Sequence, residues 1–265
     1  ILMYQYGSLT DESGHALTWN LIVNHLNAKI REICEAVGAD DYMVYITGKN
    51  NFRLSEATIK TYKGNRQDLE KPHAYQRVKD YLLSGKVHPV TVCEDWEADD
   101  GMSMAQTQGH RDIYDDIRPT VQAALEDAYK TAPKTCICSN DKDLRMVPGY
   151  HYSWKVGERI KEKPMEWVSK ITGLRWFFTQ LLTGDPTDNI LGLYKVGPKA
   201  TCVKALQELT EPLEMYTKVY SEYECRFGNH WKLFMHENAR LLWMLKSEDD
   251  DIRNYLDKLE SQRLQ

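Results

Sequence analysis

Three short apolar segments most restrict how this 265-residue chain can fold. They lie at residues 42–46, 90–93 and 135–139, and Val, Ile, Tyr and Cys dominate them. Such segments are typical of buried β-strands. Between and around them, apolar side chains recur at steps of three and four, which predicts helices at residues 16–37, 73–83, from 97 onward and 118–130. Strands that alternate with helices predict an α/β fold with a mainly parallel central sheet flanked by helices.

The second half of the chain changes character. Residues 151–154 predict a hairpin strand and 174–182 an apolar helix, whereas residues 200–265 read as all helical. We therefore expect two parts, a core over residues 1–180 and a helical part over residues 181–265.

The composition describes an ordinary globular protein. Hydrophobic residues make up 42% and charged residues 28%, and no apolar run approaches the roughly 20 residues of a membrane helix. The six cysteines form no CxxC pair. With no visible signal peptide, this predicts reduced thiols and a cytoplasmic protein without a membrane partner. The net charge of −5 argues against binding nucleic acid through overall charge, but residues 49–66 form a local basic patch.

Acidic residues gather at three places along the chain. Two groups directly follow the strands that end near Cys93 and Ser139, and the third follows the apolar helix. The carboxylates are Glu97, Asp99, Asp100, Asp141, Asp143, Asp185 and Asp188. Parallel strands bring their carboxyl ends to one rim, where so many negative charges need cations. Oxygen ligands select Mg²⁺ or Mn²⁺, and paired ions can hydrolyse phosphodiesters.

Each acidic group alone has a simpler interpretation. A single DxxD or DxD is usually a helix cap, a turn or a solvated surface, and the acids at 97–100 suit the first turn of a helix. Three groups in succession, two of them at strand ends, favour the metal site.

A glycine hairpin follows the last acidic pair. Gly192, Lys195, Gly197 and Lys199 lie just before the predicted helix that starts at Ala200. Main-chain N–H groups at such a turn can hold a phosphate backbone. Acids beside this hairpin predict a metal-dependent enzyme that binds nucleic acid.

Four motifs in this order resemble the 5′-nuclease or flap endonuclease superfamily, and most closely its phage and bacterial 5′→3′ exonuclease branch. They are FRLSEATIKTYKGNR at 52–66, EADD at 97–100, SNDKDL at 139–144 and TGDPTDNILGLYKVGPKA at 183–200. The resemblance implies a metal-dependent nuclease core with a helical arch at about residues 53–88, and a helix–three-turn–helix DNA-binding element within residues 181–265.

The resemblance also implies residue roles. The six carboxylates other than Asp100 would together bind two divalent metal ions, and Asp100 would support these ligands. Lys63 and Arg66 would contact the scissile phosphate. DNA would be bound by Arg53, Lys60 and Tyr62, the last stacking on a base, and by the hairpin 192–197 with Lys199, where carbonyls could hold K⁺. Composition alone also allows Lys63 and Arg66 to be ordinary surface charges, Tyr62 to be a packing residue, and Tyr194 and Lys195 to form a simple turn.

Two departures from the family pattern stand out. The family's first strand ends in an Asp, and here the chain starts at Ile1 without it. We expect that strand to lie upstream of Ile1. A second family Asp is replaced by Ile46-Thr47-Gly48, so one metal ion would have fewer protein ligands.

Together these features predict a monomeric Mg²⁺-dependent 5′→3′ exonuclease and flap endonuclease. Its substrate would be DNA with a free 5′ end or flap, in phage or bacterial replication. Two alternatives stay open: RNase H-like removal of RNA primers from RNA–DNA hybrids, and a structure-specific DNA-binding protein that does not cleave.

Overall fold

The computed structural model is described here for residues 1–66, 69–110, 124, 127–128, 135–158 and 160–265. The predicted α/β class is confirmed: strands are interspersed with helices up to residue 168, and helices follow. The strands are β1 (Val44–Thr47), β2 (Val90–Cys93), β3 (Cys136–Cys138), β4 (Gly149–Ser153) and β5 (Lys163–Val168). The α-helices are α1 (Leu2–Gly7), α2 (Trp19–Val37), α3 (Arg53–Glu56), α4 (Tyr75–Leu83), α5 (Ala98–Gly109), α8 (Lys170–Thr183), α9 (Thr201–Glu208), α10 (Pro212–Phe227), α11 (Trp231–Leu242) and α12 (Ile252–Arg263).

The sheet differs from the expected single layer. β1 and β2 pair in parallel as a two-stranded sheet, and β3, β4 and β5 form a second sheet in which β4 and β5 are antiparallel. Among the described residues, no strand joins β1 to β3. β5 was not predicted, because KPMEWV mixes charged and apolar residues and four of its six positions are exposed.

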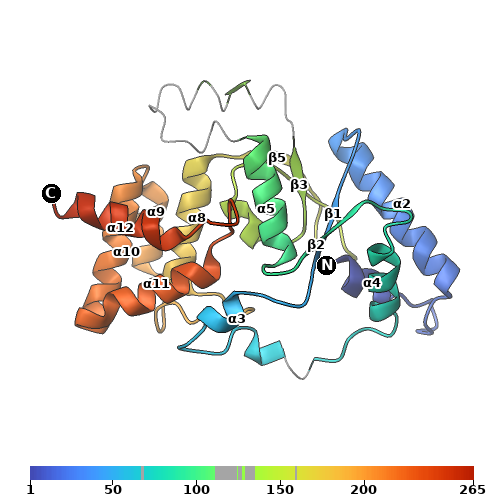
Figure 1. The fold of residues 1–265 in the computed structure, drawn as a ribbon, viewed down its shortest axis with the longest axis horizontal. Coiled ribbons are helices and arrows are strands. Elements are labelled where there is room, and N and C mark those ends of the chain that lie inside the picture. The colour runs from blue at the N-terminus through green and yellow to red at the C-terminus, as the bar shows by residue number, and fades with distance from the viewer. Residues whose placement is uncertain (67–68, 111–123, 125–126, 129–134, 159) are drawn as a thin grey trace.

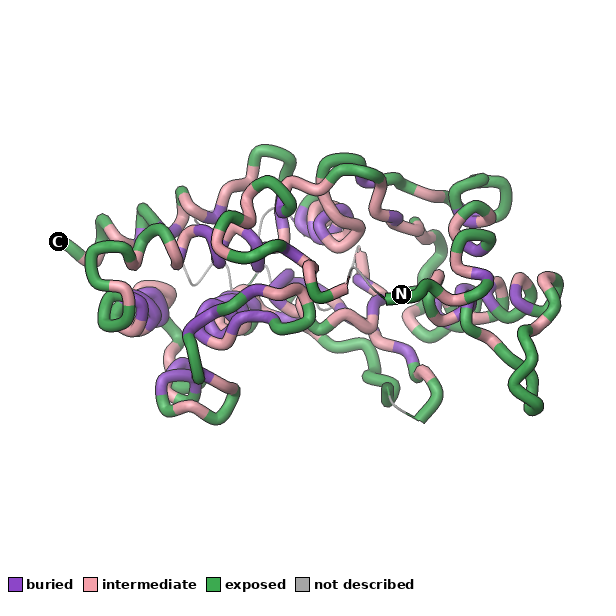
Figure 2. The backbone as a smooth tube through the Cα atoms, turned by 90° about the horizontal axis from the view of Figure 1, so that it is seen from below, coloured by how far each residue is buried: buried purple, intermediate pink, exposed green. Residues whose placement is uncertain are grey.

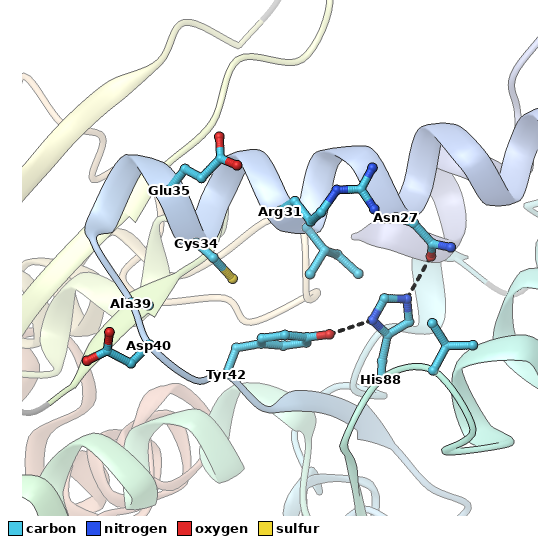
Figure 3. Close-up of a pocket in the computed structure, with 10 residues that line it drawn as sticks. Asn27, Arg31, Cys34, Glu35, Ala39, Asp40, Tyr42 and His88 are labelled. Atoms are coloured by element: carbon cyan, nitrogen blue, oxygen red, sulfur yellow. Dashed lines mark hydrogen bonds between the residues drawn. The ribbon is translucent and has the colours of Figure 1, made fainter.

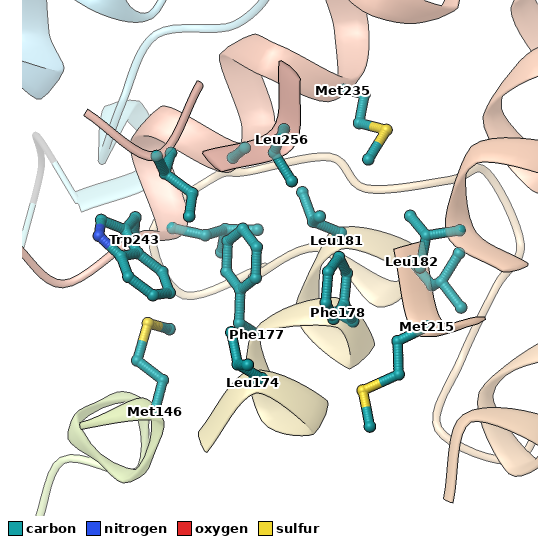
Figure 4. Close-up of a cluster of buried hydrophobic side chains, with 14 of the residues drawn as sticks. Met146, Leu174, Phe177, Phe178, Leu181, Leu182, Met215, Met235, Trp243 and Leu256 are labelled. Atoms are coloured by element: carbon teal, nitrogen blue, oxygen red, sulfur yellow. The ribbon is translucent and has the colours of Figure 1, made fainter. Parts of the chain in front are cut away.

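Helices at the two ends of the molecule bury separate cores (Figure 1). α1, α2 and α4 pack around Leu26, Val78 and Ile46 at one end. At the other end α8 packs against α9, α10 and α11, and α12 packs on α10 and α11. Phe177 and Phe178 of α8 are fully buried in this core (Figure 4). Buried backbone segments lie in both of these helical regions, with exposed stretches around them (Figure 2). Each large apolar side chain buried in this way contributes about 1.5–3 kcal/mol, so α8 is a rigid base for the loop that follows it.

Local signals explain most helix boundaries. α2 ends at Gly38, whose left-handed backbone returns hydrogen bonds to Cys34 and Glu35. α5 starts with a capping box, in which Glu97 and Asp100 each accept from the other's backbone N–H. The helix expected at 118–130 falls almost entirely outside the described residues.

In the described part of residues 53–74, which lacks residues 67–68, the elements before α4 are short. α3 is a single turn and Gly64–Arg66 is a 3-10 turn. An arch built from this region therefore stays a prediction.

Candidate metal and nucleic-acid site

The structure brings the three acidic groups together at one site. Burial and, after it, the neighbouring charges of Asp141 and Glu97 raise the pKa of Asp99 to about 7. Burial likewise raises the pKa of Asp143 to about 7, assisted by Asp141 and Asp185. Asp99 thus interacts with the second group and Asp143 with the third, although these residues are far apart in sequence.

The loop of the third acidic pair is held by backbone geometry. Asp185 and Ile190 pair as a β-bridge, and Asp185 is only 3% exposed. Gly184 and Gly192 lie against each other, and a Cβ on Gly192 would come within 2.1 Å of the Gly184 backbone nitrogen. Both glycines have positive φ angles. Only glycine permits this close approach, which turns the chain out of α8 and fixes the acidic loop.

Tyr62 links the first and third acidic groups. Its hydroxyl lies 3.0 Å from Glu97 Oε2 and 2.8 Å from Asp188 Oδ2, so its one proton is shared between the two carboxylates. The ring is 4% exposed, so neither face is open to a base. The expected stacking role is therefore wrong for this structure, because burial of the ring places Tyr62 beneath the site rather than on its surface.

Three cations lie among the carboxylates. Lys63 Nζ is 2.5 Å from Glu97 Oε1 and 3.5 Å from Asp188 Oδ2, and Arg66 pairs with Asp188. Lys142 reaches Asp143 at 2.9 Å and Asp185 at 3.6 Å. Lys63 and Arg66 were predicted to act here. Lys142 was missed, although its position between two acids in SNDKDL was a usable signal.

Asp100 is placed differently from the other acids. It is fully buried and accepts two hydrogen bonds from Arg53, at 2.5 and 2.9 Å. It also accepts from the backbone N–H groups of Glu97 and Leu245. These four hydrogen bonds occupy both of its oxygens, an arrangement that suits the expected supporting role of Asp100 better than direct binding of a metal ion. Arg53 is 1% exposed, which contradicts its predicted contact with DNA.

Two amide side chains belong to the site and had no signal in the sequence. Gln180 on α8 donates to Asp143 Oδ1 at 2.5 Å, and Asn51 donates to Glu97 Oε1 at 3.0 Å. Each amide holds one oxygen of its carboxylate, which fixes the direction of the other oxygen of that carboxylate.

The donors fit a hard divalent cation by their chemistry. Mg²⁺ and Mn²⁺ prefer oxygen ligands. Oxygen atoms are all that these carboxylates offer: Glu97, Asp99, Asp141, Asp143, Asp185 and Asp188. Burial and the neighbouring carboxylates raise the pKa values of Asp99 and Asp143, so a divalent cation beside them would stabilise their charged forms. Within the described ranges, no group of three or more His, Cys, Asp or Glu side chains is already arranged to hold a metal ion.

Thr47 is part of the segment where the resemblance would place a second Asp, and in the structure its side chain contacts α5. At the end of β1, Thr47 Oγ1 accepts a hydrogen bond from the Ala98 N–H at 3.0 Å, at the start of α5. The residue there supports the helix that carries Asp99 and offers no carboxylate.

The expected hairpin at 192–197 is a turn without strands that continues the same loop. Leu193 and Val196 are buried, and Tyr194 is 76% exposed. Arg226 on α10 donates to the Tyr194 carbonyl at 2.5 Å, which holds the tip. Lys195 and Lys199 are exposed beside it, as is Lys60 ahead of the site. Gly192 is buried and has the conformational role described above, whereas Gly197 is half-buried with open space around its Cα.

A pocket of about 430 Å³ lies elsewhere, between α2 and the segment before β2. His88 in its wall donates from Nε2 to Asn27 Oδ1, at 2.7 Å, and accepts at Nδ1 from the Tyr42 hydroxyl, at 2.8 Å (Figure 3). Burial lowers the pKa of His88, which keeps the ring neutral with both nitrogens engaged. This histidine is a structural residue.

The fold is that of phage 5′-exonucleases and flap endonucleases. The bacteriophage T5 D15 protein co-crystallised with metal ions matches with a TM-score of 0.55 at 17% identity, over 91% of each chain. A T5 D15 flap endonuclease variant in a pseudo-enzyme-product complex with DNA and metal ions matches with a TM-score of 0.56 at 15% identity, over 91% of each chain. T5 5′-exonuclease with bound zinc gives 0.54 at 18%, over 90% of this chain and 88% of that one. No protein-family model and no curated protein sequence matches this chain.

Proposed function

We propose that this chain is a divalent-metal-dependent 5′-nuclease that cleaves DNA carrying a free 5′ end or flap. The observation that carries the proposal is the convergence of three acidic groups beside Lys63 and Arg66. The fold adds support, since its T5 neighbours were crystallised with metal ions and with DNA.

The site residues divide into three roles. Two divalent cations, either Mg²⁺ or Mn²⁺, would be held by six carboxylates: Glu97, Asp99, Asp141, Asp143, Asp185 and Asp188. Bound cations would supply the charge that activates water and stabilises the leaving oxygen. Lys63 and Arg66, both only half-buried, would exchange their carboxylate partners for the scissile phosphate and stabilise its developing charge.

The hairpin and its neighbours would bind the DNA away from the cut. Lys195 and Lys199 are exposed and would contact the duplex backbone, with K⁺ on the hairpin carbonyls. Lys60 would contact the strand that enters the site. A replication role, a monomeric state and a cytoplasmic location complete the proposal. Among the described residues, no helix is long and apolar enough to cross a membrane.

Cleavage of 5′-labelled flap DNA tests this function. The chain should cut the flap with Mg²⁺ and fail with EDTA. The variant Asp141→Asn/Asp143→Asn should bind the flap but not cut it. A matched variant, Glu248→Gln/Asp249→Asn, removes two charges at exposed positions and should cut normally.

The same assay separates the alternatives. Tight flap binding without cleavage in Mg²⁺ or Mn²⁺ would support a DNA-binding protein, which the absence of a carboxylate at Thr47 favours. Faster cleavage of an RNA–DNA hybrid than of the DNA flap would support primer removal. Undiminished cleavage by the Asp141/Asp143 variant would refute the metal assignment.

A further inference from the structure

The turn at residues 61–66 is joined by hydrogen bonds to the acidic loop at residues 185–190. Three successive carbonyls of the loop accept from the turn: Pro186 O from Asn65 Nδ2 at 2.8 Å, Thr187 O from Arg66 Nε at 2.9 Å, and Asp188 O from the Lys63 N–H at 2.9 Å. The turn therefore binds the main chain of the loop, in addition to the ion pairs that its cations make with the carboxylates.

Asn189 makes the same kind of contact in the opposite direction. Its Nδ2 donates to the Thr61 carbonyl at 2.7 Å. Gly64 lies close to this amide, since a Cβ on Gly64 would come within 3.5 Å of Asn189 Nδ2 and 3.2 Å of Thr61 Cβ. One asparagine of the turn, Asn65, thus holds the loop, and one asparagine of the loop holds the turn. We call these hydrogen bonds between residues 61–66 and 186–189 the loop contact.

Two residues in the loop contact have a left-handed backbone. The φ angles are 54° for Lys63 and 64° for Asn189. Asparagine adopts this conformation more readily than most residues. Lysine seldom does, and such a conformation persists only where the surrounding contacts fix it. The hydrogen bond from the Lys63 N–H to the Asp188 carbonyl is a contact of this kind.

The acidic loop is the better anchored of the two partners. It continues directly from α8, and the bridge between Asp185 and Ile190 closes it. Inside it, the Thr187 N–H donates to Asp185 Oδ1 at 2.9 Å. The turn at 61–66 is more exposed, and Asn65 itself is exposed. The loop contact therefore transfers the position of the acidic loop to the turn.

This arrangement separates the main chain of the turn from the tips of its cations. The Lys63 ammonium and the Arg66 guanidinium pair with carboxylates in the structure. Both tips can leave these partners for a phosphate while the loop contact keeps the backbone of Lys63 beside Asp188. Exact placement of reacting groups matters, because a displacement of about 1 Å can lower a rate about 100-fold.

We propose that Asn65 and Asn189 are positioning residues for cleavage, an inference that rests on the proposed function. Their amides hold Lys63 and Arg66 at a fixed place relative to Asp188 before DNA binds. The scissile phosphate would then meet the cations and the metal ligands in one arrangement. Neither asparagine needs to touch the phosphate for this role.

Two measurements test the proposal in Asn65→Ala and Asn189→Ala. The first is amide hydrogen exchange in the protein without DNA, where exchange at Lys63 should become about 10-fold faster or more. The second is steady-state cleavage of 5′-labelled flap DNA in Mg²⁺. We expect kcat to fall about 10- to 100-fold and KM to change less than about 2-fold, because a residue that only positions others adds no substrate binding.

Further variants separate loss of the amides from general damage. Asn65→Gln keeps an amide donor and should recover most of kcat. Asn189→Gly keeps the left-handed backbone but loses the amide, so it should behave like Asn189→Ala. Asn254→Ala, at an exposed position on α12, should alter neither exchange at Lys63 nor kcat. All variants should unfold within about 3 °C of the parent chain, since their effect is local.

Three results would overturn the proposal. Unchanged exchange at Lys63 would show that the amides do not hold the turn. Faster exchange with an undiminished kcat would show that its position does not matter, and a raised KM with constant kcat would make the asparagines DNA-binding residues instead. A parent chain that cuts no flap DNA would refute the nuclease and the positioning role together, whereas failure of the positioning role alone leaves the parent chain active.

Discussion

Arg53 and Asp100 form a bidentate ion pair from which solvent is excluded, with side-chain exposures of 1% and 0%. Arg53 also donates to the carbonyls of Leu241 and Trp243. The pair therefore ties the first turn of α5, which carries Asp99, to the last turn of α11 and to Trp243, the residue after it. It lies directly behind the acidic site and connects it with the helical end of the molecule.

Removing one partner of this pair should be strongly destabilising. Arg53→Met leaves the Asp100 carboxylate buried without its cation, and we expect a loss of about 3–5 kcal/mol in unfolding free energy. Lys60→Met removes a cation at an exposed position and should change stability by less than about 0.5 kcal/mol. Urea titrations of both variants measure the difference. Similar losses in both variants would show that the pair does not support the fold.

Asp99 and Asp143 should make the protein less stable at neutral pH when divalent metal is absent. Their folded pKa values of about 7 lie above the usual 3.8. The folded state therefore binds more protons than the unfolded state between these values. Stability should fall as pH rises from about 4 to about 7 and then level off.

Neutral replacements should remove that cost. In EDTA at pH 8, Asp99→Asn and Asp143→Asn should each stabilise the chain by about 1–3 kcal/mol, and each should abolish cleavage in Mg²⁺. The matched change Asp249→Asn, at an exposed position, should alter neither property. Destabilisation by both site variants in EDTA would show that the carboxylates do not repel one another.

Glu237 of α11 should control the segment that leads to Lys63. Its carboxylate accepts from the backbone N–H groups of Thr58 and Ile59, at 2.9 and 2.7 Å, and from the Thr58 hydroxyl. These contacts hold the backbone four to five residues ahead of Lys63.

Weakening this contact should affect catalysis more than stability. Glu237→Gln keeps the size but loses the charge-assisted bonds, and we expect about a 10-fold lower kcat with faster amide exchange at residues 58–66. Glu222→Gln on α10 removes a carboxylate that pairs with Lys218 of the same helix and is the matched control. Unchanged exchange at 58–66 in Glu237→Gln would contradict a positioning role.

Local patterns were sufficient to predict most elements, because they depend on neighbours in sequence. The period of α2 and the apolar runs of β1 to β3 are of this kind. The acidic groups could be placed at one site because residues after parallel strands share a rim. The division of the sheet could not be foreseen, since pairing of β1 with β3 depends on what lies between them in space.

The roles of Arg53 and Tyr62 show the limit of reading residue types. Both lie in a basic, aromatic segment that resembles a DNA-binding element, yet both are buried. Their partners, Asp100 for one and Glu97 with Asp188 for the other, come from distant parts of the chain. No spacing rule within the segment predicts such contacts.

Lys63 should be required for cleavage but not for folding. Its side chain is 29% exposed and contacts Glu97 and Asp188 at the rim of the site. If it stabilises charge on the scissile phosphate, Lys63→Ala should lower kcat about 10²- to 10³-fold. Lys60→Ala, three residues earlier at an exposed position, should mainly raise KM, since a contact with the strand outside the site adds binding only. Single-turnover cleavage of flap DNA separates the two effects. A Lys63→Ala enzyme with unchanged kcat would remove this residue from the catalytic set and leave it as a partner of the carboxylates.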